Sequence, residues 1–136
     1  VVVSAAGPLS NLFLSVVGLI SIVAIKLLVP GSMRDLVDAL GGHRFAAGAV
    51  APLAYIFFQF AYVNFSLGIF NLIPIPPLDG SWVLASIFGS GVRRFFQEFG
   101  RFGFFVLILL SSTRILGFVM RPFLSFFFAA VRRAIS

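Results

Sequence analysis

A long uncharged stretch ends in a cluster of prolines and one carboxylate, and this feature limits the chain's possible folds most. No residue from Phe45 to Leu78 carries a charge, and three of the last five residues in that stretch are prolines. Asp79 and Gly80 follow at once. Proline interrupts helices, and a charge in hydrocarbon is costly. Non-helical backbone at membrane depth survives only where protein or a watery cavity covers it. Segment 71–80 is therefore the first candidate for a functional site.

The composition is that of a membrane protein. Of the 136 residues, 60% are hydrophobic and 10% are charged, whereas a soluble domain is about 45–50% apolar and about 25% charged. The ten Lys and Arg residues lie at the edges of apolar runs, which is typical of interfacial anchors in a lipid bilayer. No basic stripe with interleaved polar residues is present, so we exclude nucleic acid as a partner. The absence of cysteine excludes disulfides and thiolate metal sites.

The apolar runs predict one transmembrane domain over residues 1–136. Its expected parts are a transmembrane helix at 1–30, a loop at 31–44, a transmembrane helix at 45–73, a broken or re-entrant segment at 74–90, and interfacial and membrane helices at 91–136. Pro8 suits the first turn of the first helix. Two arrangements stay open for the end of the chain: a hairpin dipping partway into the membrane, or one crossing plus an interfacial helix. The fold class is all-α, a polytopic transmembrane helix bundle with a proline-broken helix that carries the Asp-Gly motif.

Small and weakly polar residues indicate where these helices pack. One stripe on the first helix consists of Gly7, Asn11, Ser15 and Gly18. Such a stripe lets membrane helices approach closely. Asn64 and Asn71 are seven residues apart and share a face of the second helix. That face should point to protein, because an amide in hydrocarbon needs partners. The single histidine, His43, has no second histidine at helical spacing, so a solvated loop residue is favoured over a metal ligand.

Asp79 has two chemical interpretations. An Asp-Gly pair often forms a turn in which the side chain bonds nearby backbone N–H groups. Alternatively, the carboxylate is a proton carrier or a metal ligand, and such oxygen ligands bind Zn²⁺ together with histidines. The preceding prolines are Pro74, Pro76 and Pro77. They remove backbone donors and could leave an extended edge that pairs with an unfolded substrate, while Gly80 permits a close approach that a Cβ would block.

Two motifs resemble those of the site-2 protease family of intramembrane zinc metallopeptidases. Asn71-x-x-Pro74-x-x-x-x-Asp79-Gly80 looks like the second signature of this family. Residues 6–11, Ala-Gly-Pro-Leu-Ser-Asn, resemble the Ala-Gly-Pro-x-x-Asn opening of the preceding core helix. The order and separation of the motifs match, and the resemblance covers roughly residues 6–84. The family's His-Glu-x-x-His helix, which lies upstream, is absent, and the chain opens with Val1. We therefore expect the C-terminal portion of a longer protease.

The resemblance implies a reaction and roles for particular residues. Asp79 would be the third zinc ligand of a His-His-Asp site, and Asn71 would bind the substrate backbone or stabilise the oxyanion. Asn64 with Pro74, Pro76 and Pro77 would bind substrate, and Gly7, Asn11 and Gly80 would be structural. The full-length protein would use Zn²⁺ to hydrolyse peptide bonds in transmembrane segments of membrane-embedded proteins, in a prokaryotic inner membrane. Without the His-Glu-x-x-His segment, the chain should be inactive alone.

Two other function classes stay open. A transporter or channel fragment would also carry a broken helix and a lone carboxylate, but the inverted repeat expected of it is not seen. A non-catalytic membrane scaffold of the same fold would lack His-Glu-x-x-His in its upstream sequence, which distinguishes it from the protease.

Overall fold

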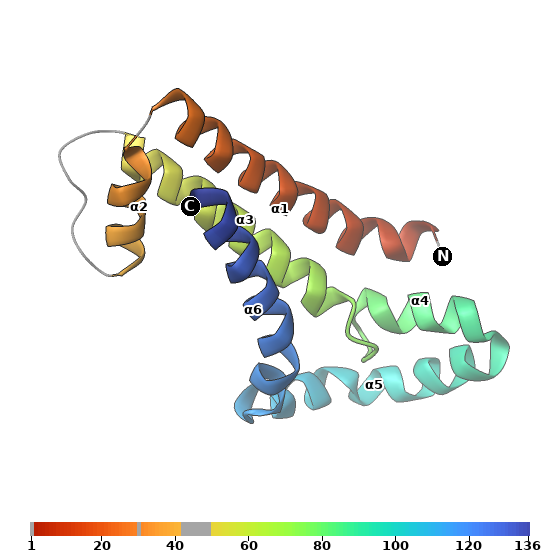
Figure 1. Ribbon diagram of the computed structural model, residues 1–136. Coiled ribbons are helices and arrows are strands. Elements are labelled where there is room, and N and C mark those ends of the chain that lie inside the picture. The colour runs from red at the N-terminus through yellow and green to blue at the C-terminus, as the bar shows by residue number, and fades with distance from the viewer. Residues whose placement is uncertain (1, 30, 42–49) are drawn as a thin grey trace.

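The chain forms helices joined by short connections in the computed structural model, which describes residues 2–29, 31–41 and 50–136 (Figure 1). The helices are α1 (Val2–Leu28), α2 (Ser32–Leu40), α3 (Val50–Asn71), α4 (Asp79–Phe88), α5 (Ser90–Ser112) and α6 (Ile115–Ile135). No strand occurs within these ranges, so the all-α prediction is confirmed. His43 lies outside the described residues.

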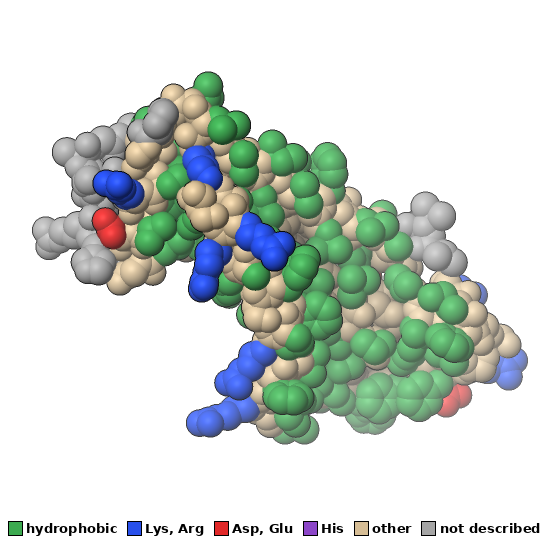
Figure 2. Space-filling view, in the orientation of Figure 1, with side chains coloured by type: hydrophobic (Ala, Val, Ile, Leu, Met, Phe, Trp, Pro, Cys, Tyr) green, Lys and Arg blue, Asp and Glu red, His purple; other side chains and the backbone are tan. Residues whose placement is uncertain are grey.

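Four of the helices, α1, α3, α5 and α6, are long and apolar enough to cross a membrane. Large apolar side chains point outward along them; Phe13 is 67% exposed and Phe126 is 70% exposed. The visible face is mostly hydrophobic, and Lys and Arg side chains occur only at separate places on it (Figure 2). Such a surface suits lipid, where exposed apolar groups are not penalised. The predicted polytopic transmembrane bundle is thus confirmed.

Small residues allow α1 and α3 to pack closely along their length (Figure 1). A Cβ built on Gly18 of α1 would lie 2.8 Å from the Cβ of Ala61 on α3. A Cβ on Gly68 of α3 would lie 2.9 Å from the side chain of Leu12 on α1. Ser15, between these points on α1, is 2% exposed. The small-residue stripe therefore forms a helix interface, as the sequence predicts.

The core lies where α1, α2, α3 and α6 meet. Phe127 of α6, 1% exposed, stands at its centre. Its ring centroid is 5.0 Å from that of Phe65 and 6.2 Å from that of Phe58, both on α3. Helix α6 thus runs back from the end of α5 to the α1–α3 pair, and the C-terminus lies beside α3 (Figure 1).

The structure corrects two expectations in the first part of the chain, one on α1 and one after it. Pro8 lies inside α1 rather than in its first turn, because the helix already begins at Val2. Its fully buried ring packs into the helix interface, where neighbouring helices make a membrane proline tolerable. Residues 31–44 were expected to be a loop, yet they contain the nine-residue helix α2. Met33 and Leu36 of α2, 7% and 0% exposed, are buried in the core, and this burial stabilises the helix.

The end of the chain forms two long helices. Helix α5 continues for 23 residues, from the charged segment around Arg94 and Glu98 into the apolar run that follows Arg101. Helix α6 is a second candidate span of 21 residues. The change in composition after Arg101 does not interrupt the helix, since no proline occurs between Ser90 and Ser112 to remove a backbone hydrogen bond.

The α1–α3 interface yields a stability prediction. We expect Gly18→Ala to lower the free energy of unfolding by about 1–3 kcal/mol, the usual cost of overpacking, because the new methyl meets Ala61. The control is Gly117→Ala on α6, where no atom lies within 4 Å of the new Cβ. It should gain roughly 0.5–1 kcal/mol from helix propensity. Thermal unfolding in detergent measures both. A Gly18→Ala protein as stable as Gly117→Ala would contradict this interface.

Candidate active site

The predicted site segment forms a tight loop between α3 and α4. Helix α3 ends at Asn71 and α4 begins at Asp79, so all three prolines lie in the loop 72–78. Within the loop, the backbone N–H of Ile75 donates to the carbonyl of Ile73 at 2.8 Å, and that of Leu78 donates to the carbonyl of Ile75 at 2.9 Å. The peptide bond between Pro76 and Pro77 is cis. The loop therefore has its own folded backbone.

Two glycines let neighbouring helices close on this loop. A Cβ on Gly80 of α4 would collide with the carbonyl of Leu72 and would lie 2.7 Å from the carbonyl oxygen of Ile73. Gly80 therefore permits a close approach of the loop backbone to α4. A Cβ on Gly103 of α5 would collide with the carbonyl of Pro76. Because these obstacles are backbone atoms, only glycine fits at either position.

A buried serine fixes the start of α4. Ser81 is 0% exposed, and its hydroxyl donates to the carbonyl of Leu78 at 2.7 Å. Its backbone N–H donates to the same carbonyl at 3.2 Å. Leu78 itself is in an extended conformation, with φ −68° and ψ 151°. These bonds set the direction in which the first residue of α4, Asp79, leaves the loop.

The Asp79 carboxylate is half-buried at the N-terminal end of α4. A negative charge is favourable there, because the helix dipole and the free N–H groups attract anions. In the described part of the chain, its carboxylate has no hydrogen-bond or ion-pair partner. The turn interpretation, in which the side chain bonds nearby backbone N–H groups, is therefore not what the structure shows. The carboxylate is left available for a ligand.

Helix α1 brings the first motif against this carboxylate. A Cβ built on Gly7 would lie 3.0 Å from the Oδ2 atom of Asp79. Helices α1 and α4 are in contact, although the two motifs lie far apart in the sequence. Glycine at position 7 thus leaves open the space beside the carboxylate. A larger side chain there would press on the group that is the candidate metal ligand.

The three predicted asparagines lie on α1 and α3, at different separations from Asp79. Asn71 is the half-buried last residue of α3, next to the loop, and Asn11 is half-buried on α1, one turn after Gly7. Asn64 lies about two turns earlier on α3, and its amide N–H donates to the carbonyl of Phe60 at 2.8 Å. One of its two amide N–H donors is therefore already used within its own helix.

The three prolines have different environments. Pro76 is buried, and its Cβ lies 3.1 Å from the position of a Cβ on Gly103. Pro74 and Pro77 are exposed. Pro74 also lines a cavity of about 230 Å³ with residues of α3, the loop and α6. Pro76 therefore anchors the loop, and the other two prolines are accessible from outside.

Sequence reasoning gave no role to Gly103 or Ser81. Gly100 and Gly103, three residues apart, leave one face of a turn of α5 without side chains, and that spacing was the available signal for a close contact. Ser66 on α3 was also missed; its hydroxyl oxygen is buried without a hydrogen-bond partner in the structure.

A zinc ion would fit this site only in part. Asp79 offers one oxygen ligand, and it is unoccupied by other protein groups among the described residues. No group of three or more His, Cys, Asp or Glu residues comes together in the same described ranges. Catalytic zinc sites usually have three protein ligands and one open position. Among the described residues, Asp79 therefore fits as one ligand of such a site, and the set of three is not present.

Comparison with known proteins identifies one family. The model of Peptidase family M50 matches residues 1–111. The chain is 33% identical over 125 residues to the protein named "Putative zinc metalloprotease YwhC" of Bacillus subtilis (strain 168). This match covers 92% of the chain but 51% of the relative, so the chain spans about half the length of that protein. No solved structure matches the chain at a significant level.

Proposed function

Because the chain belongs to peptidase family M50, we propose that it is the Asp-bearing part of an intramembrane zinc endopeptidase of the site-2 protease type. The observation that carries the proposal is the Asp79 carboxylate itself. It lies at the N-terminal end of α4, has no partner among the described residues, and faces the open space left by Gly7. Both motif segments therefore converge on one group that can bind a metal.

In this proposal, Asp79 supplies one zinc ligand and a His-Glu-x-x-His segment outside the described residues supplies the others. When bound there, zinc would activate a water and polarise the carbonyl of the bond to be cut. The first turn of α4, fixed by Ser81, orients the carboxylate. Gly7 has no side chain that could press against this carboxylate. Without the other ligands, we expect the isolated chain to bind zinc weakly and to be inactive.

The substrate class that fits the loop is a transmembrane segment of another membrane protein. Such a segment must unwind before its carbonyl is attacked, and the unwound backbone needs hydrogen-bond partners. Pro74 and Pro77 are exposed and have no N–H, so the loop offers carbonyl acceptors there. The Asn71 amide, next to the loop, can both donate and accept. We assign it to the substrate backbone or the oxyanion, and Asn64, through its free oxygen, to a more distant contact.

We place the full-length protein in a prokaryotic cell membrane as a multi-pass protein. Four helices long and apolar enough to span a bilayer and a bacterial relative support this location.

Metal removal tests the proposal. We expect the full-length protein, reconstituted in vesicles, to cleave a reporter that carries a transmembrane segment, and a chelator to abolish cleavage. Added zinc should restore it, because the metal provides the activated water. Gel analysis of the reporter and the zinc content of the protein are measured together. Undiminished cleavage by protein shown to contain no metal would refute the zinc mechanism.

A further inference from the structure

A groove runs along α2 where it meets α3 and α6. Its larger part has a volume of about 430 Å³ and is lined by Val37 and Leu40 of α2, Phe58 of α3, and Phe128 and Arg132 of α6, among others. A second part of about 390 Å³ shares Leu40, Phe58 and Phe128 and therefore adjoins the first. Ligand sites typically have volumes of about 300–1,000 Å³. We call these two adjoining hollows together the α2 groove.

Several cationic side chains lie at the same end of the bundle as the α2 groove (Figure 2). Arg132 lines the groove, and Arg34 lines an adjoining cavity that Val37 also lines. Lys26 of α1 donates to the carbonyl of Ala134, near the end of α6, at 3.3 Å, so its charge is held there too. Asp38 is the acidic residue that lines the adjoining cavity, and it has an interaction of its own.

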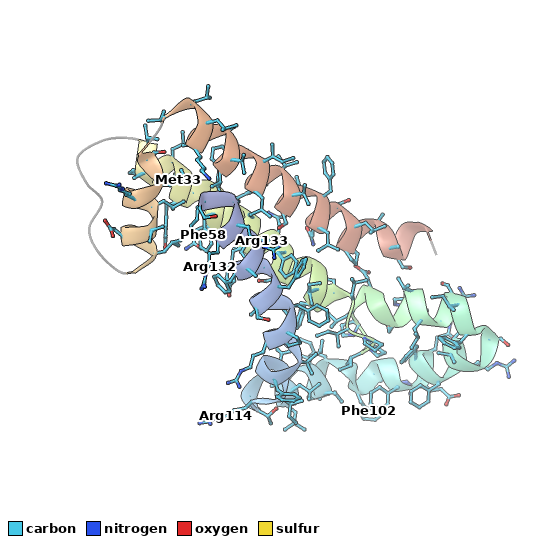
Figure 3. All side chains as sticks on the ribbon, viewed as in Figure 1. Met33, Phe58, Phe102, Arg114, Arg132 and Arg133 are labelled. Carbon is cyan, nitrogen blue, oxygen red and sulfur yellow. The ribbon has the colours of Figure 1, made fainter. Side chains whose placement is uncertain are left out.

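This concentration of charge indicates the membrane surface. Charged groups avoid hydrocarbon, so an end of the bundle with several Lys and Arg side chains belongs at the level of the lipid headgroups. Phe58 and Arg132 lie in the region where α3 and α6 come together beside α2 (Figure 3). Tyr55, which lines the second part of the groove and accepts a hydrogen bond from Gln59, is of the residue type found in interfacial belts. The α2 groove thus leads from an apolar floor to a cationic mouth.

We propose that the α2 groove binds an anionic phospholipid. Its acyl chain lies against Leu40, Phe58 and Phe128, and its phosphate pairs with the Arg132 guanidinium, whose fork of N–H donors suits phosphate oxygens. The groove offers contacts to both the acyl chain and the phosphate of such a lipid. A soluble anion would make no contact with the aromatic side chains, and a purely apolar segment would make no ion pair with Arg132. Basic pockets between membrane helices bind anionic headgroups in the same way.

A bound lipid would contact three helices at once. Helices α2, α3 and α6 all contribute lining residues. A ligand that binds the folded state raises its stability by mass action. We therefore expect phosphatidylglycerol to stabilise the chain against heat more than phosphatidylcholine does at the same concentration.

The test is lipid binding to the full chain in detergent, by native mass spectrometry, with phosphatidylglycerol and phosphatidylcholine as probes. Arg132→Gln should weaken phosphatidylglycerol binding about fivefold, the usual effect of one Arg at an anionic surface, and should leave phosphatidylcholine unchanged. Arg121→Gln and Arg133→Gln are matched controls, because both change one exposed charge on α6 and neither residue lines the groove. Both controls should keep the preference. Leu40→Trp, which fills the groove, should weaken binding of both lipids.

Four results would overturn the proposal. An equal loss in all three Arg variants would mean general attraction to surface charge. Unchanged phosphatidylglycerol binding in both Arg132→Gln and Leu40→Trp would place the lipid elsewhere. A dimeric mass that Leu40→Trp abolishes would make a second copy the occupant. A lower melting temperature of Leu40→Trp without lipid, with lipid binding intact, would mean that another part of the chain fills the groove.

Discussion

Replacing Asp79 by asparagine in the full-length protein is expected to remove bound zinc and to abolish cleavage. Asparagine keeps the size of the side chain but loses the negative charge, and a neutral amide is a much poorer zinc ligand than a carboxylate. Loss of an outer-shell partner already costs about 10–100-fold in metal affinity or activity. Loss of a direct ligand should exceed about 100-fold. The fold should survive, because the Asp79 carboxylate forms no hydrogen bond or ion pair with the described residues.

The measurement is zinc per polypeptide, taken beside cleavage of a membrane-anchored reporter. Glu98→Gln is the matched control: it removes one negative charge from an exposed position on α5 and should leave zinc content and cleavage unchanged. Helix content by circular dichroism accompanies both variants. Full zinc and full activity in Asp79→Asn would refute the ligand assignment. Loss of helix content in Asp79→Asn alone would make the carboxylate a structural group instead.

Much of the helical layout follows from apolar length alone. Long apolar runs predicted the helices at 1–30 and 45–73 that became α1 and α3, since about 20 such residues span a bilayer as a helix. The end of α4 at Phe88 agrees with a local signal, because glycines and a serine come directly after this residue. Gly89 has a positive φ of 86°, which a side chain would disfavour. These features are local, so the sequence pattern is sufficient to predict them.

Features that depend on distant contacts were not predictable in the same way. Helix α2 is stabilised by burial of Met33 and Leu36 among other helices, and nine residues carry too little periodicity to reveal that. The continuity of α5 was missed because a change from charged to apolar residues resembles a boundary, although it leaves the backbone hydrogen bonds intact. A change in composition along a helix therefore indicates a change in its environment, and it does not show where the helix ends.

In the candidate site, too, local features were predictable and contacts between distant segments were not. Asp79 and Gly80 were predicted from their position after the prolines, and Gly7 from a motif resemblance. The direct approach of Gly7 to the Asp79 carboxylate depends on how α1 meets α4, which no local pattern contains. Gly103 was missed for a related reason: its partner is a backbone carbonyl, and a carbonyl has no sequence signature.

Gly103→Ala is expected to disrupt the loop that precedes Asp79. The new methyl would collide with the carbonyl of Pro76, and its centre would lie 2.6 Å from the carbonyl carbon. A side chain could rotate away, but a backbone carbonyl can move only if the loop or α5 moves with it. Overpacking typically costs about 1–3 kcal/mol and occasionally more; a backbone obstacle should put Gly103→Ala at the upper end. A shift of about 1 Å at a catalytic group can cost about 100-fold in rate, so cleavage should fall even where the protein folds.

Gly100→Ala provides the matched control for this prediction. It lies one turn earlier on α5 and faces the same proline, but the nearest atom to its new Cβ is the Pro76 Cβ at 3.9 Å, an ordinary contact. Both variants gain the same helix propensity, so the difference in their melting temperatures isolates the collision with the loop. In the full-length protein, reduced cleavage with normal zinc content in Gly103→Ala would show that α5 positions the loop for substrate. If Gly103→Ala and Gly100→Ala were equally stable and equally active, α5 would not hold the loop, and the orientation of Asp79 would depend on α4 and α1 alone.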